Sequence, residues 1–247
     1  MLLSVVIPMY NEAETAKVSA ELLSRRFYDA GISFELIFSD DGSTDGGAGV
    51  ISAMSQRIPE IKLVCSPIRY GKGAAVRRGI LAASGDYVVY TGCNLAYGAE
   101  SVTAILEKLR VTGADVAIGS RALHPCGYRG YSKTRKLASL AYMQVLKYAA
   151  GFSYTDAQCG LKAFTKRAAQ RIFALCETDG CAFEFEVLTI ADKLGLSVLE
   201  YPVRVAGSVI HKTKVRMVPS AVGMVRDAVK IKRRHKKPKS TKGVSEK

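Results

Sequence analysis

The chain has 247 residues, of which 48% are hydrophobic, and it carries a formal net charge of +14. A chain of this length and composition buries a substantial core, so a disordered protein and a small disulfide-stapled fold are both excluded. The positive charge predicts a partner that carries negative charge, such as nucleic acid, anionic lipid or nucleotide phosphates. A dense share of the basic residues follows Lys230, so the body of the chain is less basic than the total indicates.

The six cysteines are scattered and form no metal-binding spacing, so they predict reduced thiols in a cytoplasmic protein. The N-terminal apolar run stops at Pro8 without a basic segment before it, so we expect no signal peptide. No run of about 18 apolar residues occurs, so we expect no helix that spans a bilayer.

Short apolar runs alternate with segments of helical periodicity. The expected strands cover 2–7, 34–38, 62–65, 87–90, 116–118 and 198–205. The expected helices cover 13–30, 46–57, 74–83, 101–112, 137–150, 166–175, 182–194 and 215–231. This alternation predicts an α/β fold with a doubly wound, mostly parallel sheet and helices on both faces. Ligands of such sheets bind beyond the carboxyl ends of the strands, so the residues after each strand are candidates for a site.

The last expected helix is amphipathic and leads into a basic tail. Its valines lie on one face at helical spacing: Val215, Val218, Val222, Val225 and Val229. This pattern predicts a helix that lies on an anionic membrane surface, with a solvated tail as the alternative. We therefore expect a main domain at 1–213, an amphipathic basic helix at 214–235 and a disordered basic tail at 236–247.

Polar residues follow the first two expected strands. The run Pro-Met-Tyr-Asn-Glu at 8–12 is explained without a ligand if the strand stops at its proline and Asn11 caps the next helix. After the second strand, Asp40, Asp41 and Asp45 lie in one turn. Helix caps and turns explain Asp45, whereas two adjacent acids at a strand end need compensating donors or a cation.

A glycine-rich segment, Gly71-Lys72-Gly73, opens the third expected helix. Its small residues allow the backbone to approach a ligand closely. The segment is neither a dinucleotide fingerprint nor a P-loop, so by itself it specifies no phosphate site.

Together these segments resemble the family 2 glycosyltransferases, which have a glycosyltransferase A-type fold. The resemblance covers about residues 1–230, and the matching segments continue through 84–86, 119–121, 131–137, 156–164, 183–186 and 200–203. The segment from Asp156 to Phe164 is the most specific. It is similar to the polyprenyl-phosphate sugar transferases, and most of all to dolichyl-phosphate glucosyltransferases.

The resemblance implies an inverting transfer of a hexose, with glucose from UDP-glucose expected first, to a polyprenyl or dolichyl phosphate at the cytoplasmic face of a membrane. The donor-binding residues that it implies are Pro8, Tyr10, Glu12, Asp40, Asp41, Lys72, Gly92 and Asn94. The catalytic residues that it implies are Arg121, Arg135, Asp156, Gln158 and Glu184, and Arg135 and Lys214 would meet the acceptor phosphate. Each of these residues also has an explanation without a ligand. Glu184 and Glu186 could be one solvated and one capping acid, and Arg135 could lie on a solvent-exposed helix face.

The chain departs from the family pattern after the expected strand at 87–90. Relatives carry Asp-Ala-Asp-Leu-Gln there, which holds Mg²⁺ or Mn²⁺ on the donor diphosphate, whereas this chain has Gly-Cys-Asn-Leu-Ala at 92–96. Magnesium prefers hard oxygen ligands, so Asn94 is a poor substitute and the soft sulfur of Cys93 is unsuited.

Three alternatives follow from this departure. Asp41 holds a cation with waters, or the chain binds the nucleotide without transferring sugar, or fixed cationic side chains replace the metal. The residues available for this third role are Arg121, Arg135, Lys72 and Lys214. A phosphate acceptor is already largely dianionic near neutral pH, so none of these alternatives requires a general base.

Other readings keep the fold and change the chemistry. A different donor such as GDP-mannose, a polysaccharide hydroxyl as acceptor, or a non-catalytic binder of nucleotide sugars would each leave most of the motifs in place. Nucleic acid is not expected, because the basic tail lacks interleaved aromatic residues. The pattern leaves the oligomeric state open.

Overall fold

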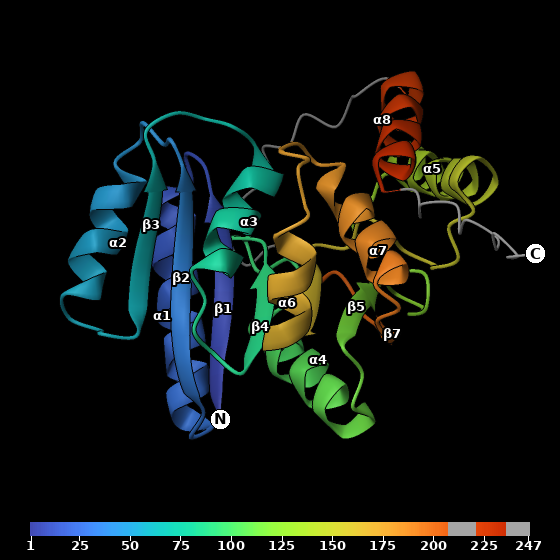
Figure 1. Ribbon diagram of the computed structural model, residues 1–247. Helices are drawn as coiled ribbons and strands as arrows, with labels where there is room; N and C mark the ends of the chain where they lie inside the picture. The colour runs from blue at the N-terminus through green and yellow to red at the C-terminus, as the bar shows by residue number, and fades with distance from the viewer. Residues whose placement is uncertain (207–220, 236–247) are drawn as a thin grey trace, which may run out of the picture.

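The computed structural model describes residues 1–206 and 221–235 and places seven strands in one sheet, in the order β3-β2-β1-β4-β6-β5-β7 (Figure 1). The strands are β1 (Leu2–Met9), β2 (Ser33–Asp41), β3 (Ile61–Ser66), β4 (Tyr87–Thr91), β5 (Val116–Ser120), β6 (Leu161–Thr165) and β7 (Val198–Pro202). Only β6 runs antiparallel to its neighbours among these strands. The predicted mostly parallel sheet is confirmed.

Strand β6 was not among the predicted strands. It is a run of five residues whose second residue is Lys162, and a lysine within so short a strand hides the apolar pattern. The side chain of Lys162 is nevertheless fully buried. Because β6 is antiparallel to β4, Leu161 lies opposite Thr91, and the segment before β6 reaches the carboxyl end of β4.

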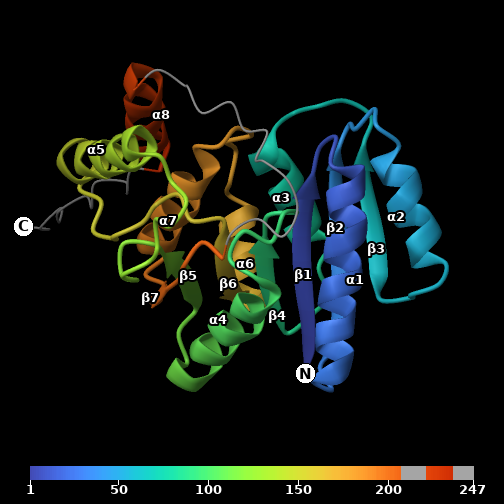
Figure 2. The same cartoon turned by 180° about the vertical axis from the view of Figure 1, so that it is seen from behind.

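Helices cover both faces of the sheet (Figures 1 and 2). They are α1 (Ala13–Asp29), α2 (Gly47–Ser55), α3 (Lys72–Leu81), α4 (Ala99–Thr112), α5 (Lys133–Ala150), α6 (Lys166–Phe173), α7 (Phe183–Lys193) and α8 (Ala221–Arg234). Helices α3, α6 and α7 contribute to the core on one face, and α1 and α4 contribute to the core on the other. The predicted helices are found with bounds that shift by a few residues, and 215–220 of the last predicted helix lie outside the described residues.

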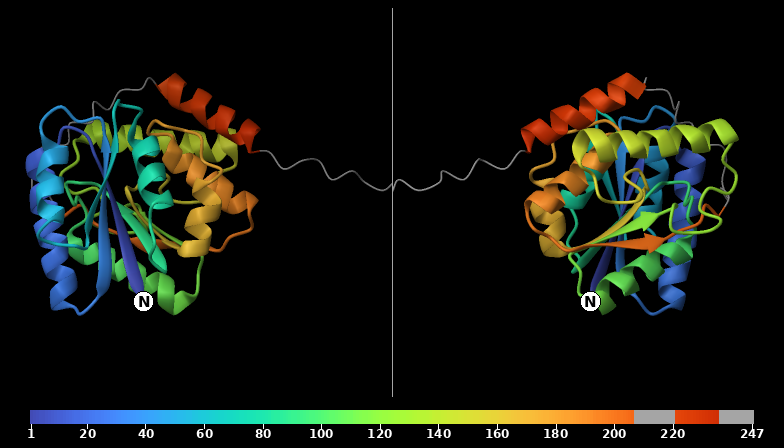
Figure 3. Two further views of the ribbon diagram at one scale, coloured as in Figure 1. Left: turned by 60° about the vertical axis from the view of Figure 1, so that its left-hand side comes forward. Right: turned by 90° about the vertical axis from the view of Figure 1, so that its right-hand side faces the viewer.

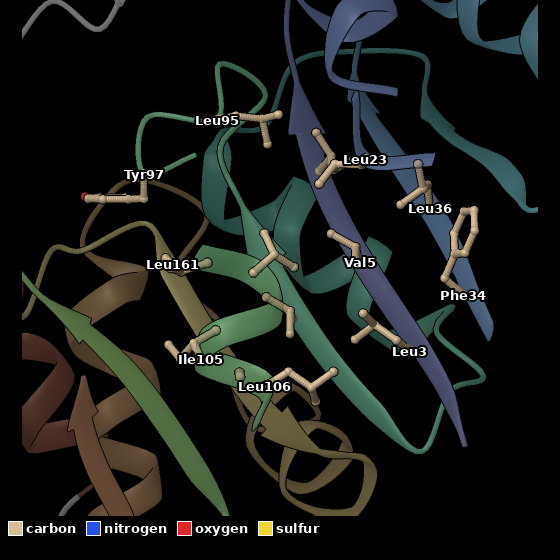
Figure 4. Close-up of a cluster of buried hydrophobic side chains, with 14 of the residues drawn as sticks. Leu3, Val5, Leu23, Phe34, Leu36, Leu95, Tyr97, Ile105, Leu106 and Leu161 are labelled. Atoms are coloured by element: carbon tan, nitrogen blue, oxygen red, sulfur yellow. The ribbon is translucent and has the colours of Figure 1, made fainter. Parts of the chain in front are cut away.

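The core follows the alternation of side chains along each strand. In β1, Val6 packs with the α3 side of the sheet, whereas Leu3 and Val5 pack with the α1 side. Figure 4 shows this second cluster, in which Leu95 and Tyr97 from the loop after β4 join the strand residues. Complete burial of one such aliphatic side chain stabilises the fold by about 1.5–3 kcal/mol.

Helices α5 and α8 pack together at the end of the molecule toward which the parallel strands run (Figure 3). Ala228 and Ile231 of α8 and His235 directly after it are buried, and this side of the helix meets α5 and α7. Val229 of the predicted apolar face is only half-buried at its edge. The side of α8 that carries Ala228 and Ile231 is therefore covered by protein, whereas the side chains of Val222 and Val225 are not among those that the structure describes. Residues 214–220 and the tail at 236–247 of the predicted C-terminal region lie outside the described residues.

Candidate active site

Two loops meet at the carboxyl ends of β1 and β2. The backbone N–H of Asn11 donates to Ser43 Oγ at 2.9 Å, and the side-chain oxygen of Asn11 accepts from the N–H of Thr44 at 2.8 Å. Asp45 accepts from the N–H of Ala13 at 2.9 Å, so Asp45 caps α1. The predicted cap at Asn11 is wrong, because Asn11 has a φ of 50° and joins the two loops instead.

Asp40 and Asp41 are both buried, and their charges are compensated by donors of the protein. Asp41 accepts from the backbone N–H groups of Tyr70 at 3.1 Å and Gly71 at 2.7 Å. Asp40 accepts from the N–H and the hydroxyl of Ser43. The donors that the sequence required for these adjacent acids are therefore present, and Asp41 fixes the turn that leads into α3.

Tyr10 and Arg69 face each other beside this turn. The guanidinium carbon of Arg69 lies 4.1 Å from the centroid of the Tyr10 ring, a cation–π contact. Pro8 lies within β1, opposite Ser39 of β2, and Glu12 directly precedes α1. The structure thus places the residues predicted for the nucleotide base around the ends of β1 and β2.

The glycines at the start of α3 approach the protein's own backbone. A Cβ at position 71 would lie 2.5 Å from the carbonyl oxygen of Asp179, and one at position 73 would overlap that of Thr178. Gly71 also has a φ of 134°. Glycine is therefore needed at these positions because the backbone lies against the loop before α7. A ligand is not required to explain these glycines.

Lys72 and Glu184 form the centre of the site. Lys72 Nζ lies 2.9 Å from Glu184 Oε1. The other carboxylate oxygen of Glu184 accepts from Lys162 and from the hydroxyl of Tyr90. Lys162 Nζ also donates to the carbonyl oxygen of Cys159 at 2.7 Å. One buried carboxylate thus meets two ammonium groups, which leaves one positive charge in excess.

The pKa shifts follow from these contacts. Burial alone would raise the pKa of Glu184, but Lys162 and Lys72 outweigh it, so the pKa of Glu184 falls below its usual value. Burial alone would lower the pKa of Lys72, but the Glu184 carboxylate raises it overall. Burial and Glu184 together raise the pKa of Tyr90 well above its usual value. Near neutral pH, Lys72 and Glu184 are therefore charged and Tyr90 is a neutral donor.

Arg121 and Asp156 form a second buried ion pair, at the end of β5. Arg121 Nε and Nη2 donate to the two oxygens of Asp156 at 2.6 and 2.7 Å, and Nη1 donates to the Tyr131 hydroxyl at 2.8 Å. The N–H of Gln158 donates to Asp156 Oδ1 at 3.0 Å. Burial alone would lower the pKa of Arg121, but the hydrogen bonds to Asp156 raise it, so the guanidinium stays charged.

The run at 92–96 does not offer a divalent cation the ligands that it prefers. Cys93 is buried beside Ser19, and Leu95 is buried in the core, so both side chains point away from the strand ends. Burial raises the pKa of the Cys93 thiol. Asn94 supplies one neutral oxygen, whereas magnesium and manganese sites use carboxylates. Among the described residues, no group of three or more acids, cysteines and histidines could hold a metal.

Two predicted cationic residues are not placed beside this site. Arg135 lies in the first turn of α5, and its side chain is not among those that the structure describes. Lys214 lies outside the described residues. The alternative of one solvated and one capping acid is wrong for Glu184 and Glu186, because both side chains are buried.

Lys162 and Tyr90 belong to the site although neither is among the predicted site residues, and Lys162 lies in the motif segment from Asp156 to Phe164. Both lie within strands, at positions where a core side chain is expected. The signal available in the sequence was a lysine inside a short apolar run, and its meaning depends on Glu184, 22 residues away.

Comparison with known families and proteins bears on the chemistry of this site. The family described as "Glycosyl transferase family 2" matches residues 4–173. A dolichyl-phosphate beta-glucosyltransferase of Trichomonas vaginalis is 29% identical over 93% of this chain and 72% of its own length. One of Dictyostelium discoideum is 29% identical over 94% of this chain and 74% of its own length. The glycosyltransferase AglD of Haloferax volcanii is 31% identical over 90% of this chain, which spans 35% of AglD.

Solved structures share the fold. Glucosyl-3-phosphoglycerate synthase from Mycobacterium tuberculosis, in complex with Mn²⁺, UDP and glucosyl-3-phosphoglycerate, superposes with a TM-score of 0.67 at 22% identity, covering 97% of this chain and 81% of that one. Mannosyl-3-phosphoglycerate synthase from Rubrobacter xylanophilus gives a TM-score of 0.69 at 18% identity, covering 94% and 74%. The predicted A-type fold is confirmed by these neighbours.

Proposed function

The chain belongs to glycosyl transferase family 2 and is a glycosyltransferase, and from that premise we propose that it transfers glucose from UDP-glucose to a polyprenyl phosphate at a membrane surface. The observation that carries this proposal is the match to dolichyl-phosphate beta-glucosyltransferases over 93% and 94% of the chain. The segment from Asp156 to Phe164, which resembles those enzymes most, forms the Arg121 partner and the strand that carries Lys162.

The reaction requires positioning and charge rather than a base. An oxygen of the acceptor phosphate attacks the anomeric carbon and forms the new C–O bond on the face opposite the leaving group. The bond from that carbon to the nucleoside diphosphate breaks, and the diphosphate leaves with the electron pair. Since a phosphate monoester is largely dianionic near neutral pH, with a second pKa of about 6, no proton has to be removed.

The leaving diphosphate gains negative charge, and the protein's own cations oppose it. The excess positive charge of Lys72 and Lys162 over Glu184 is available at the strand ends without a metal. Such fixed charges stabilise a transition state most where the site excludes water. The residues at 92–96 do not fit a divalent cation, so the proposed reaction includes no step through one.

The exposed apolar residues of α5 support the proposal that a membrane surface is a partner. Leu137, Leu140 and Tyr148 are 69%, 42% and 89% exposed, and helical spacing places them on one side of α5. The neighbouring α8 exposes Arg226, Lys230, Lys232 and Arg233. Exposed apolar residues beside basic ones suit an anionic lipid surface, where each basic residue contributes about 1 kcal/mol.

We propose that the protein lies on the membrane surface. No helix within residues 1–206 and 221–235 has the length and hydropathy that a bilayer span requires. All six cysteines are unpaired, which fits the reducing environment at the cytoplasmic face.

The test is an incubation of the purified chain with radiolabelled UDP-glucose and a polyprenyl phosphate, followed by solvent extraction. We expect radiolabel in the organic phase, and mild acid should release it as glucose. GDP-mannose in the same assay tests the alternative donor, and thermal shifts with UDP and GDP report nucleotide preference independently. Absence of lipid-linked glucose with UDP-glucose would overturn the proposed donor, and absence of lipid-linked product with both donors would overturn transfer to a polyprenyl phosphate.

A further inference from the structure

Glu186 of α7 joins the C-terminal helix to the loop before α7. Its carboxylate is fully buried, and Oε2 accepts from the backbone N–H groups of Glu177 at 3.1 Å and Thr178 at 2.7 Å. Oε1 lies 2.8 Å from Nε2 of His235 and 3.1 Å from Nη1 of Arg234, both at the end of α8. A buried carboxylate requires such partners, so Glu186 binds both the end of α8 and the loop before α7.

The same loop holds the first turn of α3. The carbonyl oxygen of Asp179 accepts from the N–H groups of Gly73 at 2.6 Å and Ala74 at 3.3 Å, two donors that a helix N-terminus leaves unpaired. The carboxylate of Asp179 accepts from Nη2 of Arg77 at 2.7 Å, one turn further along α3. The position of the loop therefore fixes the position of this turn.

Lys72 lies in that turn, directly before Gly73, and pairs with Glu184 two residues before Glu186. A continuous series of contacts thus runs from α8 through Glu186, the loop and α3 to the Lys72 ammonium. We propose that Glu186 is a positioning residue that couples the seating of α8 to the donor-facing end of α3. Coupling of this kind travels through contiguous packed and hydrogen-bonded groups.

Amide hydrogen exchange tests the coupling without any substrate. The variants are Glu186→Gln, Arg234→Gln and His235→Ala, with Arg233→Gln as the matched control, because Arg233 is the exposed neighbour of Arg234. We expect faster exchange in peptides that cover 71–76 and 177–180 in the three variants, and unchanged exchange in the control. His235→Gln keeps a side-chain donor and should restore most of the protection that His235→Ala loses.

The kinetic consequence rests on the proposed function. If Glu186 positions Lys72 for the transfer step, Arg234→Gln should lower kcat about five-fold or more while the KM for the nucleotide sugar changes less. Arg234 is partly exposed, so this variant should fold even if Glu186→Gln does not. A rise in KM at constant kcat would contradict a role in positioning Lys72 for the transition state.

Different results would overturn the coupling through Glu186 and the proposed glycosyl transfer. Faster exchange in the variants of a chain that transfers no sugar would keep the coupling and overturn the function. Unchanged exchange at 71–76 in both Arg234→Gln and His235→Ala would overturn the coupling, whatever the activity.

Discussion

Lys72 Nζ and Glu184 Oε1 lie 2.9 Å apart, although 112 residues separate them in the chain. The pair brings the first turn of α3 against the first turn of α7, at the carboxyl end of the parallel strands. Because Lys162 shares the same carboxylate, the Lys72 ammonium is not needed to neutralise Glu184. Since its side chain is also the more exposed of the two lysines, we propose that Lys72 meets the anionic substrate.

Replacement of Lys72 by methionine should lower kcat for glycosyl transfer about a hundredfold, a loss typical for one charge that stabilises a transition state. Glu184 keeps Lys162 and Tyr90 as donors, so the melting temperature should change little. Lys108→Met, at an exposed position of α4, is the control and should retain wild-type activity. An active Lys72→Met enzyme would remove this lysine from the mechanism.

Gly73→Ala should destabilise the protein by more than about 2 kcal/mol, the scale of an overpacked core. The added Cβ would overlap the carbonyl oxygen of Thr178 and lie 2.8 Å from Phe183 Cβ. Gly49→Ala in α2 is the matched control, because nothing lies within 4 Å of its Cβ. That control should be neutral or stabilising by up to about 1 kcal/mol. Equal denaturation midpoints for the two variants would contradict the close approach of α3 to the loop.

Sequence patterns predicted the sheet and the motif-bearing loops because each depends on neighbouring residues. Apolar runs bounded by turns located β1 to β5, and the acids at Asp40 and Asp41 pointed to compensating donors. Contacts between residues that are distant in the chain could not be predicted in the same way. In the sequence, Lys162 interrupts an apolar run, and only the fold shows that it pairs with Glu184. Gly73 is typical of a ligand-binding loop, and only the fold shows that it packs against Thr178.

Glu35 should make the stability of the fold depend on pH in acid. Burial alone would raise its pKa, but hydrogen bonds from Lys62, Ser4 and Ser84 outweigh burial and lower the pKa to about 2. A lowered pKa in the folded state stabilises the fold above the usual value of 4.5, and this stability disappears as the pH falls toward about 2.

Glu35→Gln should therefore lower the free energy of unfolding at pH 7 by about 2 kcal/mol and flatten its dependence on pH between about 5 and 2. Urea denaturation at a series of pH values measures both effects. Glu107→Gln, at an exposed acid that pairs with Arg110 on α4, should leave the curve unchanged. A Glu35→Gln curve parallel to that of the wild type would show that Glu35 is not the titrating group.

The exposed side of α5 should be required for membrane binding. Replacement of both Leu137 and Tyr148 by serine should weaken co-sedimentation with anionic vesicles about tenfold, because it removes exposed apolar area from the proposed lipid contact. Leu81→Ser with Val111→Ser, at exposed apolar residues of α3 and α4, is the control. Equal loss in both double variants would show that this side of α5 is not a specific lipid contact.

We propose above that fixed ammonium groups, rather than a divalent cation, stabilise the negative charge of the leaving diphosphate. The most direct measurement compares lipid-linked glucose formed by the wild-type chain in excess EDTA and in Mn²⁺. We predict similar initial rates in the two conditions, and a requirement for Mn²⁺ only after both Gly92→Asp and Asn94→Asp are introduced. Transfer by the wild-type chain that stops in EDTA and returns with Mn²⁺ would contradict the claim.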